Sequence, residues 1–373
     1  MKIGVVKELK EHEYRVALTP AGCEELVELG HEVLVQSGAG AGSGLADQAY
    51  EHAGGELVAD AAPIFAGAEM ILKVKEPLPV EWPHMRSGQI VFTYYHLAAS
   101  RELTDGVLAS GAYCFAYETL DVDGHLPLLE PMSEVAGRLA IQAGAKFLEA
   151  PVGGTGILLG GVPGVPPAHV LVIGGGTVGS NAARMAAGLG ADVTVLDINL
   201  KTLRHLDEIL PANCRTVYST QMALRTELAR ADLVVGAVLV PGAAAPKLIR
   251  REDLAIMKRG CVVVDVAVDQ GGCIETARPT THENPTFVVD EVVHYCVANM
   301  PGAVPRTSTH ALTNATLPWV KRLAKLGAAR AIEESAPLRS AANAIAGKLT
   351  CAAVGEAFDM PVVDPREALR ASA

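Results

Sequence analysis

Three spaced glycines in this sequence could bind a phosphate group. The stretch HVLVIGGGTVGSNAARM contains Gly174-x-Gly176-x-x-Gly179 between an apolar run and an Ala-rich segment. This spacing permits a tight turn, lets the backbone approach a pyrophosphate and lets a helix pack on a strand. Asp197 closes the next apolar run, where its carboxylate can accept hydrogen bonds from an adenosine ribose. The pattern favours NAD over NADP, because the Asp197 carboxylate would repel the 2′-phosphate of NADP. The structural alternative is a Gly-rich turn with a helix-capping Asp.

Polar side chains follow several other apolar runs. Arg15 precedes a predicted helix, His96 follows IVFTYY, Asp269 ends GCVVVDVAVD, and Asn299 lies in CVANMPG. Ligands of open α/β sheets bind outside the carboxyl ends of the strands, so these four are candidate site residues. Arg can hold a carboxylate with two hydrogen bonds, and His can transfer protons near neutral pH. A solvated Arg, a packing His and turn-forming Asp or Asn are the plain alternatives. Asp265, inside its run, is expected to be a structural partner.

Two lysines stand at the end of another apolar run, in EMILKVKEP. A strand period of two would place Lys73 and Lys75 on the same face. Burying an unpaired ammonium group is costly, so both need partners or water. Two solvated lysines at a strand exit are one interpretation. Lys73 is expected to form a supporting ion pair or to lie on a solvated rim.

The elements that must position these residues follow an α/β pattern. Short β-branched runs alternate with Ala- and Leu-rich helical segments, which is typical of parallel sheets covered on both faces. A helix is expected over 20–30, with Thr19 as N-cap and Gly30 as its stop. The expected strands are 2–6, 31–36, 69–74, 89–95, 169–176, 192–198, 231–240, 260–269 and 286–292.

Length and element order predict two Rossmann-like domains with mainly parallel sheets, the NAD domain being inserted into the substrate domain. We expect residues 1–129 and 306–373 to form the substrate domain and 130–305 the NAD-binding domain. The Gly/Pro-rich segment 152–167 is typical of a connection near a domain boundary. The Ala-rich end, 325–350, is expected to be helical, without strands of its own.

Composition narrows the class of ligand. The chain has 373 residues, half of them hydrophobic, but Gly, Pro or charge interrupts every apolar run before it could cross a bilayer. A net charge of −11 without a Lys/Arg block argues against nucleic acid and anionic membranes as partners. Seven cysteines without a C-x-x-C pair indicate reduced thiols, not disulfides or a metal site. The start lacks a secretory-signal pattern, so we expect a cytoplasmic protein with small-molecule ligands.

Longer blocks resemble bacterial L-alanine dehydrogenases of the alanine dehydrogenase and pyridine nucleotide transhydrogenase family. The matching blocks include GVVKELKEHEYRVALTP, ILKVKEPL, FTYYHLAASREL, VDVAVDQGGCIE and YCVANMPGAVPRTSTHALTNATLP. The resemblance implies NAD-dependent oxidative deamination of L-alanine to pyruvate and ammonium, and the reverse reductive amination. Hydride would pass between the substrate Cα and nicotinamide C4. It also implies a hexamer.

The resemblance also implies residue roles. Arg15 and Lys75 correspond to substrate-carboxylate residues, and His96 and Asp269 to the catalytic pair; which of that pair is the principal proton-transfer group stays open. The implied NAD contacts are Ser133, Gly174, Gly176, Thr177, Val178, Gly179, Asp197, Ser219, Val238, Leu239, Val266, Ala267, Asp269, Arg278, Val297, Ala298, Asn299 and Met300. Thr202 stands where some members have an adenosine-side lysine, with Lys201 one position earlier.

Two other functions remain open. One is a dehydrogenase of the same form acting on another amino acid or a 2-hydroxy acid. The other is a non-catalytic NAD-binding sensor or a transhydrogenase-like nucleotide module. The presence of both KVKEP and His96 favours the alanine dehydrogenase interpretation over the transhydrogenase-like one.

Overall fold

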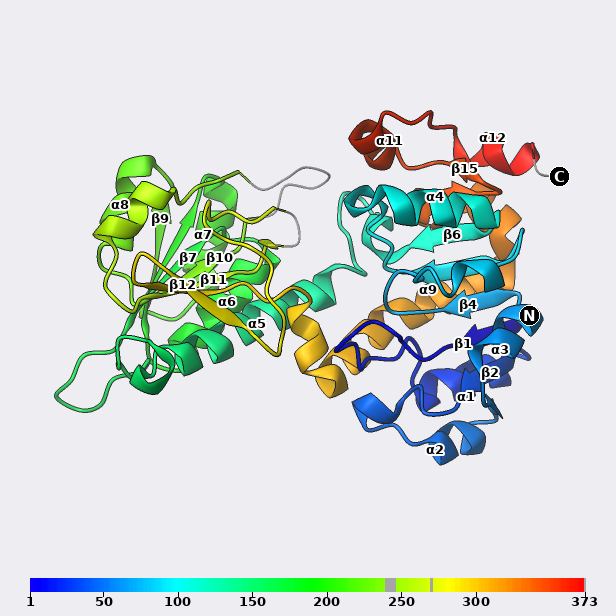
Figure 1. The fold of residues 1–373 in the computed structure, drawn as a ribbon, viewed down its shortest axis with the longest axis horizontal. Coiled ribbons are helices and arrows are strands. Elements are labelled where there is room, and N and C mark those ends of the chain that lie inside the picture. Colours follow the sequence, from blue (N-terminus) through cyan, green and yellow to red (C-terminus); the bar gives the residue numbers. More distant parts are fainter. Residues whose placement is uncertain (239–245, 269–270, 372–373) are drawn as a thin grey trace. The chain divides into compact units, whose positions relative to one another are not determined.

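Two separate, mainly parallel sheets organise the chain. The computed structural model describes residues 1–238, 246–268 and 271–371 (Figure 1). Unit 1 comprises Met1–Met132 and Gly302–Ala373, and unit 2 comprises Ser133–Pro301. Unit 2 is therefore inserted into the sequence of unit 1.

The sheet of unit 1 has the order β15-β14-β6-β5-β4-β1-β2-β3. Its strands are β1 (Lys2–Val5), β2 (Glu32–Gln36), β3 (Glu56–Val58), β4 (Met70–Leu72), β5 (Ile90–Thr93), β6 (Tyr113–Ala116), β14 (Ala342–Ile345) and β15 (Lys348–Leu349). Neighbours among β1 to β6 are parallel. From β1 the chain continues to β2 on one side and returns to β4 on the other. The carboxyl ends of β1 and β4 thus lie at a switch point, where open α/β sheets bind ligands.

The helices of unit 1 are α1 (Pro20–Glu28), α2 (Asp47–His52), α3 (Ala61–Gly67), α4 (Arg101–Ser110), α9 (Pro305–Glu334), α10 (Ala336–Ala341), α11 (Ala352–Phe358) and α12 (Pro365–Arg370). The first helix begins at Pro20, as predicted, and ends at Glu28, two residues before the expected stop at Gly30. Thr19 Oγ1 accepts a hydrogen bond from the Gly22 N–H at 3.2 Å. Beyond the last turn, Gly30 adopts φ +82°, a conformation that favours glycine.

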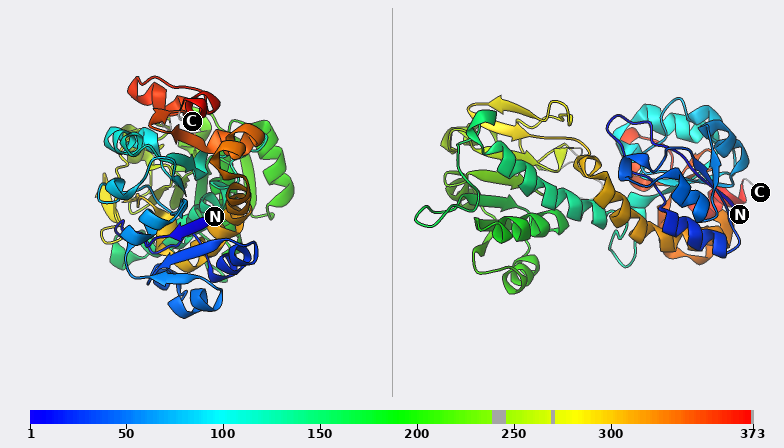
Figure 2. Two further views of the ribbon diagram at one scale, coloured as in Figure 1. Left: turned by 90° about the vertical axis from the view of Figure 1, so that its right-hand side faces the viewer. Right: turned by 90° about the horizontal axis from the view of Figure 1, so that it is seen from below.

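The prediction that the C-terminal segment lacks strands is wrong. Strand β14 pairs antiparallel with β6, and β15 pairs antiparallel with β14. Figures 1 and 2 show this orange and red segment beside the blue and cyan part of unit 1. All four residues of β14 are buried. Alanine favours helices intrinsically, but the unpaired edge of β6 and burial override that preference.

The sheet of unit 2 has the order β12-β13-β11-β10-β7-β8-β9. Its strands are β7 (His169–Ile173), β8 (Asp192–Asp197), β9 (Cys214–Tyr218), β10 (Leu233–Gly236), β11 (Val262–Asp265), β12 (Thr286–Val289) and β13 (Val292–Tyr295). Only the β12–β13 pairing among these strands is antiparallel. The helices are α5 (Glu130–Phe147), which begins in unit 1, α6 (Thr177–Gly188), α7 (Leu200–Ile209) and α8 (Gln221–Leu228). The switch point of this sheet lies between β7 and β10.

Three expectations about unit 2 need correction. The predicted strand 260–269 ends at Asp265, whose carboxylate accepts hydrogen bonds from the Ala267 and Ile274 N–H groups and closes a turn. The single strand expected over 286–292 is part of the hairpin of β12 and β13. The Gly/Pro-rich segment 152–167 lies inside unit 2 and not at its boundary. In the two strand cases hydrogen bonds that sequence periodicity does not contain decide where the chain turns.

Candidate active site

The glycine loop of unit 2 joins β7 to α6 with space for a ligand. Gly174 has φ +97°, and a Cβ there would lie 2.8 Å from the Ala237 carbonyl oxygen. A Cβ on Gly179 would collide with the Gly174 carbonyl oxygen, so this glycine allows α6 to pack closely. A Cβ on Gly176, the N-cap of α6, would meet nothing within 4 Å. The loop therefore leaves open space beside backbone N–H groups at a helix N-terminus, as anion binding requires.

Asp197 holds this loop to the end of β8. Its Oδ2 accepts a hydrogen bond from the Gly175 N–H at 2.7 Å, and its Oδ1 accepts one from the Asn199 N–H at 2.7 Å. Each carboxylate oxygen can accept a further bond. The Thr202 methyl group would lie 2.9 Å from a Cβ on Gly175, whereas Lys201 is exposed. Thr202, and not Lys201, is thus the residue beside the glycine loop.

Other predicted cofactor residues also follow the carboxyl ends of unit 2 strands. Ser219 comes after β9, Val238 after β10, and Val266 and Ala267 after β11. The Ser219 N–H donates to the Asp197 carbonyl oxygen at 2.9 Å, which joins the ends of β9 and β8. Leu239 and Asp269 lie outside the described residues.

Asp265 is a structural partner, as expected. It is fully buried, and its carboxylate accepts two backbone N–H groups, each at 3.1 Å. Burial, the largest influence, raises the pKa of this carboxyl. The bonds join the end of β11 to Ala267 and Ile274.

The last group of predicted cofactor residues follows β13. Val297 and Met300 are buried, and Ala298 and Asn299 are half-buried. Asn299 adopts φ +60°, and its carbonyl oxygen lies 3.2 Å from His282 Nε2. The backbone of this segment is held by the bridge between Val297 and Thr280.

Four further predicted cofactor residues lie elsewhere in unit 2. The Arg278 guanidinium carbon lies 4.5 Å from the centroid of the Phe287 ring, within cation–π range. Ser133 is half-buried on α5. On α6, Thr177 and Val178 are the first two residues.

Arg15 is buried beside the switch point of unit 1, with 2% of its surface exposed. Its Nε and Nη2 lie 2.6 and 2.5 Å from the two carboxylate oxygens of Glu13. Its Nη1 lies 3.1 Å from the Met132 sulfur. Burial alone would lower the pKa of Arg15, but Glu13 reverses this and raises it, so the group stays charged. A guanidinium is planar and presents its donors in a rigid fork, so a carboxylate on Nε and Nη2 fixes its orientation.

The two lysines of KVKEP have different surroundings. Strand β4 ends at Leu72, so strand alternation does not extend through both lysines as predicted. Lys73 is fully buried and its Nζ pairs with Glu8 and Glu81, which confirms the expected supporting ion pair. Lys75 is half-buried, and its carbonyl oxygen accepts a hydrogen bond from Thr93 Oγ1 at 2.8 Å.

His96 follows β5 in a left-handed conformation, with φ +49° and ψ +43°. The Glu118 carboxylate holds this turn by accepting the His96 N–H at 2.6 Å. The imidazole is 40% exposed and stacks on the Tyr94 ring, with centroids 5.8 Å apart. Tyr94 is itself tied to the chain by a hydrogen bond from its hydroxyl to the Leu128 carbonyl oxygen. The imidazole is thus oriented but remains accessible to a ligand.

Unit 1 therefore places Arg15, Lys75 and His96 after β1, β4 and β5, which are adjacent in its sheet. Sequence reasoning missed the acids that hold them, Glu8, Glu13, Glu81 and Glu118. Glu13 is two residues before Arg15, a spacing that could have suggested the pair. Glu81 and Glu118 carried no such local signal.

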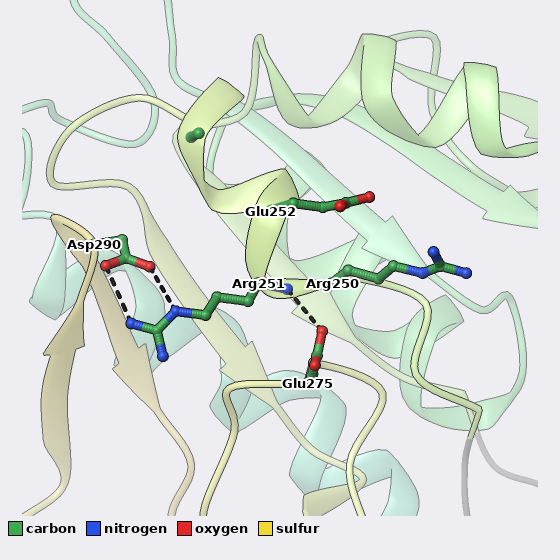
Figure 3. A pocket seen from close by; sticks show the side chains of 6 residues that line it. Arg250, Arg251, Glu252, Glu275 and Asp290 are labelled. Atoms are coloured by element: carbon green, nitrogen blue, oxygen red, sulfur yellow. Dashed lines mark hydrogen bonds and ion pairs between the residues drawn. The ribbon is translucent and has the colours of Figure 1, made fainter.

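A hollow of about 630 Å³ in unit 2 lies elsewhere (Figure 3). Arg250, Arg251, Glu252, Ala255, Glu275 and Asp290 line it. Arg251 pairs with Asp290 at 3.3 Å, and its N–H donates to Glu275 at 2.9 Å. None of the predicted site residues lines this hollow.

Within the described part of the chain, no helix combines the length and apolar character that crossing a bilayer requires.

Comparisons with known proteins agree along nearly the whole chain. Residues 4–136 and 140–352 match the models of the N- and C-terminal domains of alanine dehydrogenase/PNT. The chain is 59% identical to an alanine dehydrogenase of Halomonas elongata over 365 residues, 98% of each chain. It is 52% identical to that of Bacillus subtilis over 371 residues, covering 99% of this chain and 98% of the relative.

Comparisons with solved structures agree with these sequence comparisons. An L-alanine dehydrogenase matches with a TM-score of 0.93 and 49% identity, over 96% of this chain and 99% of the other. A transhydrogenase from Sinorhizobium meliloti matches with a TM-score of 0.80 and 26% identity, over 95% and 100%. The resemblance found in the sequence blocks is thereby confirmed: this chain belongs to the alanine dehydrogenase/PNT family.

Proposed function

We propose that this chain is an NAD-dependent L-alanine dehydrogenase, which interconverts L-alanine with pyruvate and ammonium. The observation that carries the proposal is identity of 49–59% to alanine dehydrogenases over essentially the full length. Two Rossmann-like sheets and the glycine loop after β7 support a nicotinamide cofactor. Unit 1 would bind the substrate and unit 2 the nucleotide. A hexamer in the cytoplasm is proposed by resemblance.

The cofactor would be held by backbone and carboxylate groups of unit 2. The N-terminus of α6 would bind the pyrophosphate beside Gly176, and Asp197 would accept the adenosine ribose hydroxyls. When bound, NAD supplies the hydride acceptor. Asp197 would repel the 2′-phosphate of NADP, so we expect a clear preference for NADH. Titration of nucleotide fluorescence tests this, because Asp197→Ser should narrow the difference between the NADH and NADPH dissociation constants.

The substrate carboxylate would be held by Arg15 and Lys75. Glu13 occupies Nε and Nη2 of Arg15 and so orients the guanidinium. Such fixed donors reduce the freedom of a small substrate and align its Cα for reaction. Two cations also suit a substrate with a single carboxylate. The amine of this substrate must be neutral when hydride leaves its Cα.

Proton transfer would involve His96 and Asp269. The accessible imidazole of His96 can hydrogen-bond to the carbonyl oxygen of pyruvate in the amination direction. Asp269, which follows β11 in the sequence, would supply negative charge beside the reacting amine. Both His96 and Asp269 are candidates for the principal base.

The deciding experiment measures NADH oxidation with ammonium and a panel of 2-oxo acids. Pyruvate should be the best substrate; equal or faster turnover of larger oxo acids would indicate a dehydrogenase for another amino acid. The likeness to a transhydrogenase raises a second candidate, a nucleotide module. That candidate predicts NAD binding without reduction of NAD by L-alanine.

A further inference from the structure

A buried cluster of three charges lies next to Lys75. Lys73 Nζ is 2.8 Å from Glu81 Oε1 and 3.3 Å from Glu8 Oε2. Lys73 is fully buried, and Glu8 and Glu81 are 7% and 3% exposed. Burial alone would lower the pKa of Lys73, but the two carboxylates reverse this and raise it. The ammonium group therefore stays charged inside unit 1.

Both glutamates also bind the backbone on either side of Lys75. Glu8 Oε1 accepts the Val74 N–H at 2.6 Å. Glu81 Oε2 accepts the Leu78 N–H at 2.8 Å. Each carboxylate thus uses one oxygen for the Lys73 ammonium and the other for the segment that carries Lys75.

Two more hydrogen bonds hold the same segment. Thr93 Oγ1, at the end of β5, donates to the Lys75 carbonyl oxygen at 2.8 Å. Trp82 Nε1 donates to the Pro77 carbonyl oxygen at 2.8 Å. The backbone from residue 73 to 78 is therefore fixed by side chains from three other parts of unit 1.

Such a cluster is a costly way to stabilise a fold. Desolvation of buried charges often offsets their attraction, and apolar side chains of similar volume stabilise as well or better. A lysine is a long, flexible side chain, so its ammonium can hold a substrate at a defined point only if its backbone is fixed. The cluster fixes the backbone in this way at the exit of β4.

We propose that Lys73, with Glu8 and Glu81, is a positioning residue that sets the place of the Lys75 ammonium for the substrate carboxylate. This inference rests on the proposed function, in which Lys75 binds that carboxylate. It distinguishes the two lysines of KVKEP: one touches the substrate and the other holds the backbone of the first.

The test is the Lys73→Met variant, which keeps the length of the side chain but removes its charge. The KM for L-alanine and the dissociation constant of pyruvate for the NADH-loaded enzyme should rise about 10- to 100-fold, as displacement of a binding group predicts. The dissociation constant of NADH should not change. Lys258→Met is the matched control, because Lys258 pairs with buried Asp232 at 2.7 Å in unit 2. It should leave pyruvate affinity unchanged.

Coupling to Lys75 separates positioning from a general structural role. In a Lys75→Ala background, Lys73→Met should have little further effect on pyruvate affinity; an undiminished effect would overturn the proposal. If Lys73→Met does not fold, Thr93→Val tests the same point, because it removes the bond to the Lys75 carbonyl oxygen and, besides that, a long 3.5 Å bond to the Tyr94 carbonyl oxygen. Unchanged pyruvate affinity in this variant also overturns the proposal. Wild-type enzyme that binds pyruvate but does not turn over L-alanine would instead contradict the proposed function.

Discussion

The two units share a sheet arrangement but differ at their switch points. In unit 2, residues 174–176 alone separate β7 from α6, and the candidate site consists of backbone N–H groups around open space. In unit 1, residues 6–19 separate β1 from α1, and this longer connection carries Glu8, Glu13 and Arg15. One switch point therefore exposes backbone, and the other presents charged side chains.

The difference follows from what each site is proposed to bind. A pyrophosphate spreads its charge over several oxygens, which N–H groups at a helix end can contact if no side chain intervenes. A small amino acid offers one carboxylate and a reacting amine, so it needs cations and a proton-transfer group in fixed places. The same fold thus serves two chemistries through the connections after its first strands.

The largest effect is expected from His96→Asn. Asparagine tolerates the left-handed backbone at this position, so the change removes the imidazole with little strain. Turnover should fall about 10²- to 10⁴-fold, as for loss of a general acid–base group, while the NADH dissociation constant stays unchanged. Steady-state kinetics and nucleotide titration measure this. The control is His125→Asn, at an exposed histidine. Weakened NADH binding by His96→Asn would contradict the assignment of the substrate to unit 1 and of the nucleotide to unit 2.

Lys75→Ala should give the next largest effect. A hydrogen bond to a charged group is worth about 1.5–3 kcal/mol, which corresponds to a loss of about 10- to 150-fold in kcat/KM for L-alanine. NADH affinity should remain near that of the wild type. Lys2→Ala, at the amino edge of the sheet, is the matched control. Unchanged kinetics in Lys75→Ala would remove this residue from the site.

Gly176→Val is the reciprocal change in unit 2. Because a Cβ there meets nothing within 4 Å, the melting temperature should hardly change. The side chain would fill the space proposed for the pyrophosphate, and the NADH dissociation constant should rise about tenfold, the equivalent of about 1.4 kcal/mol. Gly188→Val, at the open end of α6, should leave binding unchanged. Tight NADH binding by Gly176→Val would show that the loop does not hold the cofactor.

The smallest effect concerns Glu76, which pairs with Lys10 at 2.5 Å. Burial opposes ionisation, but Lys75 and Lys10 together lower the pKa of this carboxyl below 4.5. Its stabilisation is therefore present above pH 4.5 and is lost as the pH falls through the lower folded-state value. Glu76→Gln should destabilise by less than about 1 kcal/mol at pH 7.

Melting temperatures at pH 7 and pH 3 measure this effect. The difference between Glu76→Gln and wild type should shrink at the lower pH. Glu24→Gln, on the exposed side of α1, is the control. A difference that grows on acidification would contradict the assigned direction of the pKa shift.

Much of the fold could be predicted from local patterns. The alternation of β-branched and Ala-rich runs indicated the sheets, and Thr19, Pro20 and Gly30 marked the first helix, because caps and turns depend on neighbouring residues. The strand at Ala342–Ile345 was missed because its partner β6 is more than 200 residues earlier in the chain. The end of β11 was placed beyond Asp265, because the sequence does not show that the Ile274 N–H donates a hydrogen bond to the Asp265 carboxylate and closes the turn.

The sequence by itself determined the family, the α/β architecture, the glycine loop and the candidate residues Arg15, Lys75 and His96, since these depend on residue type and local spacing. Only the tertiary structure decided which acids surround them: Glu13 on Arg15, Glu118 under His96, and Glu8 and Glu81 on Lys73. An ion pair forms between atoms brought together by packing, and no local pattern specifies that packing. For this reason KVKEP predicted two charged side chains, but the fold decided which one is buried.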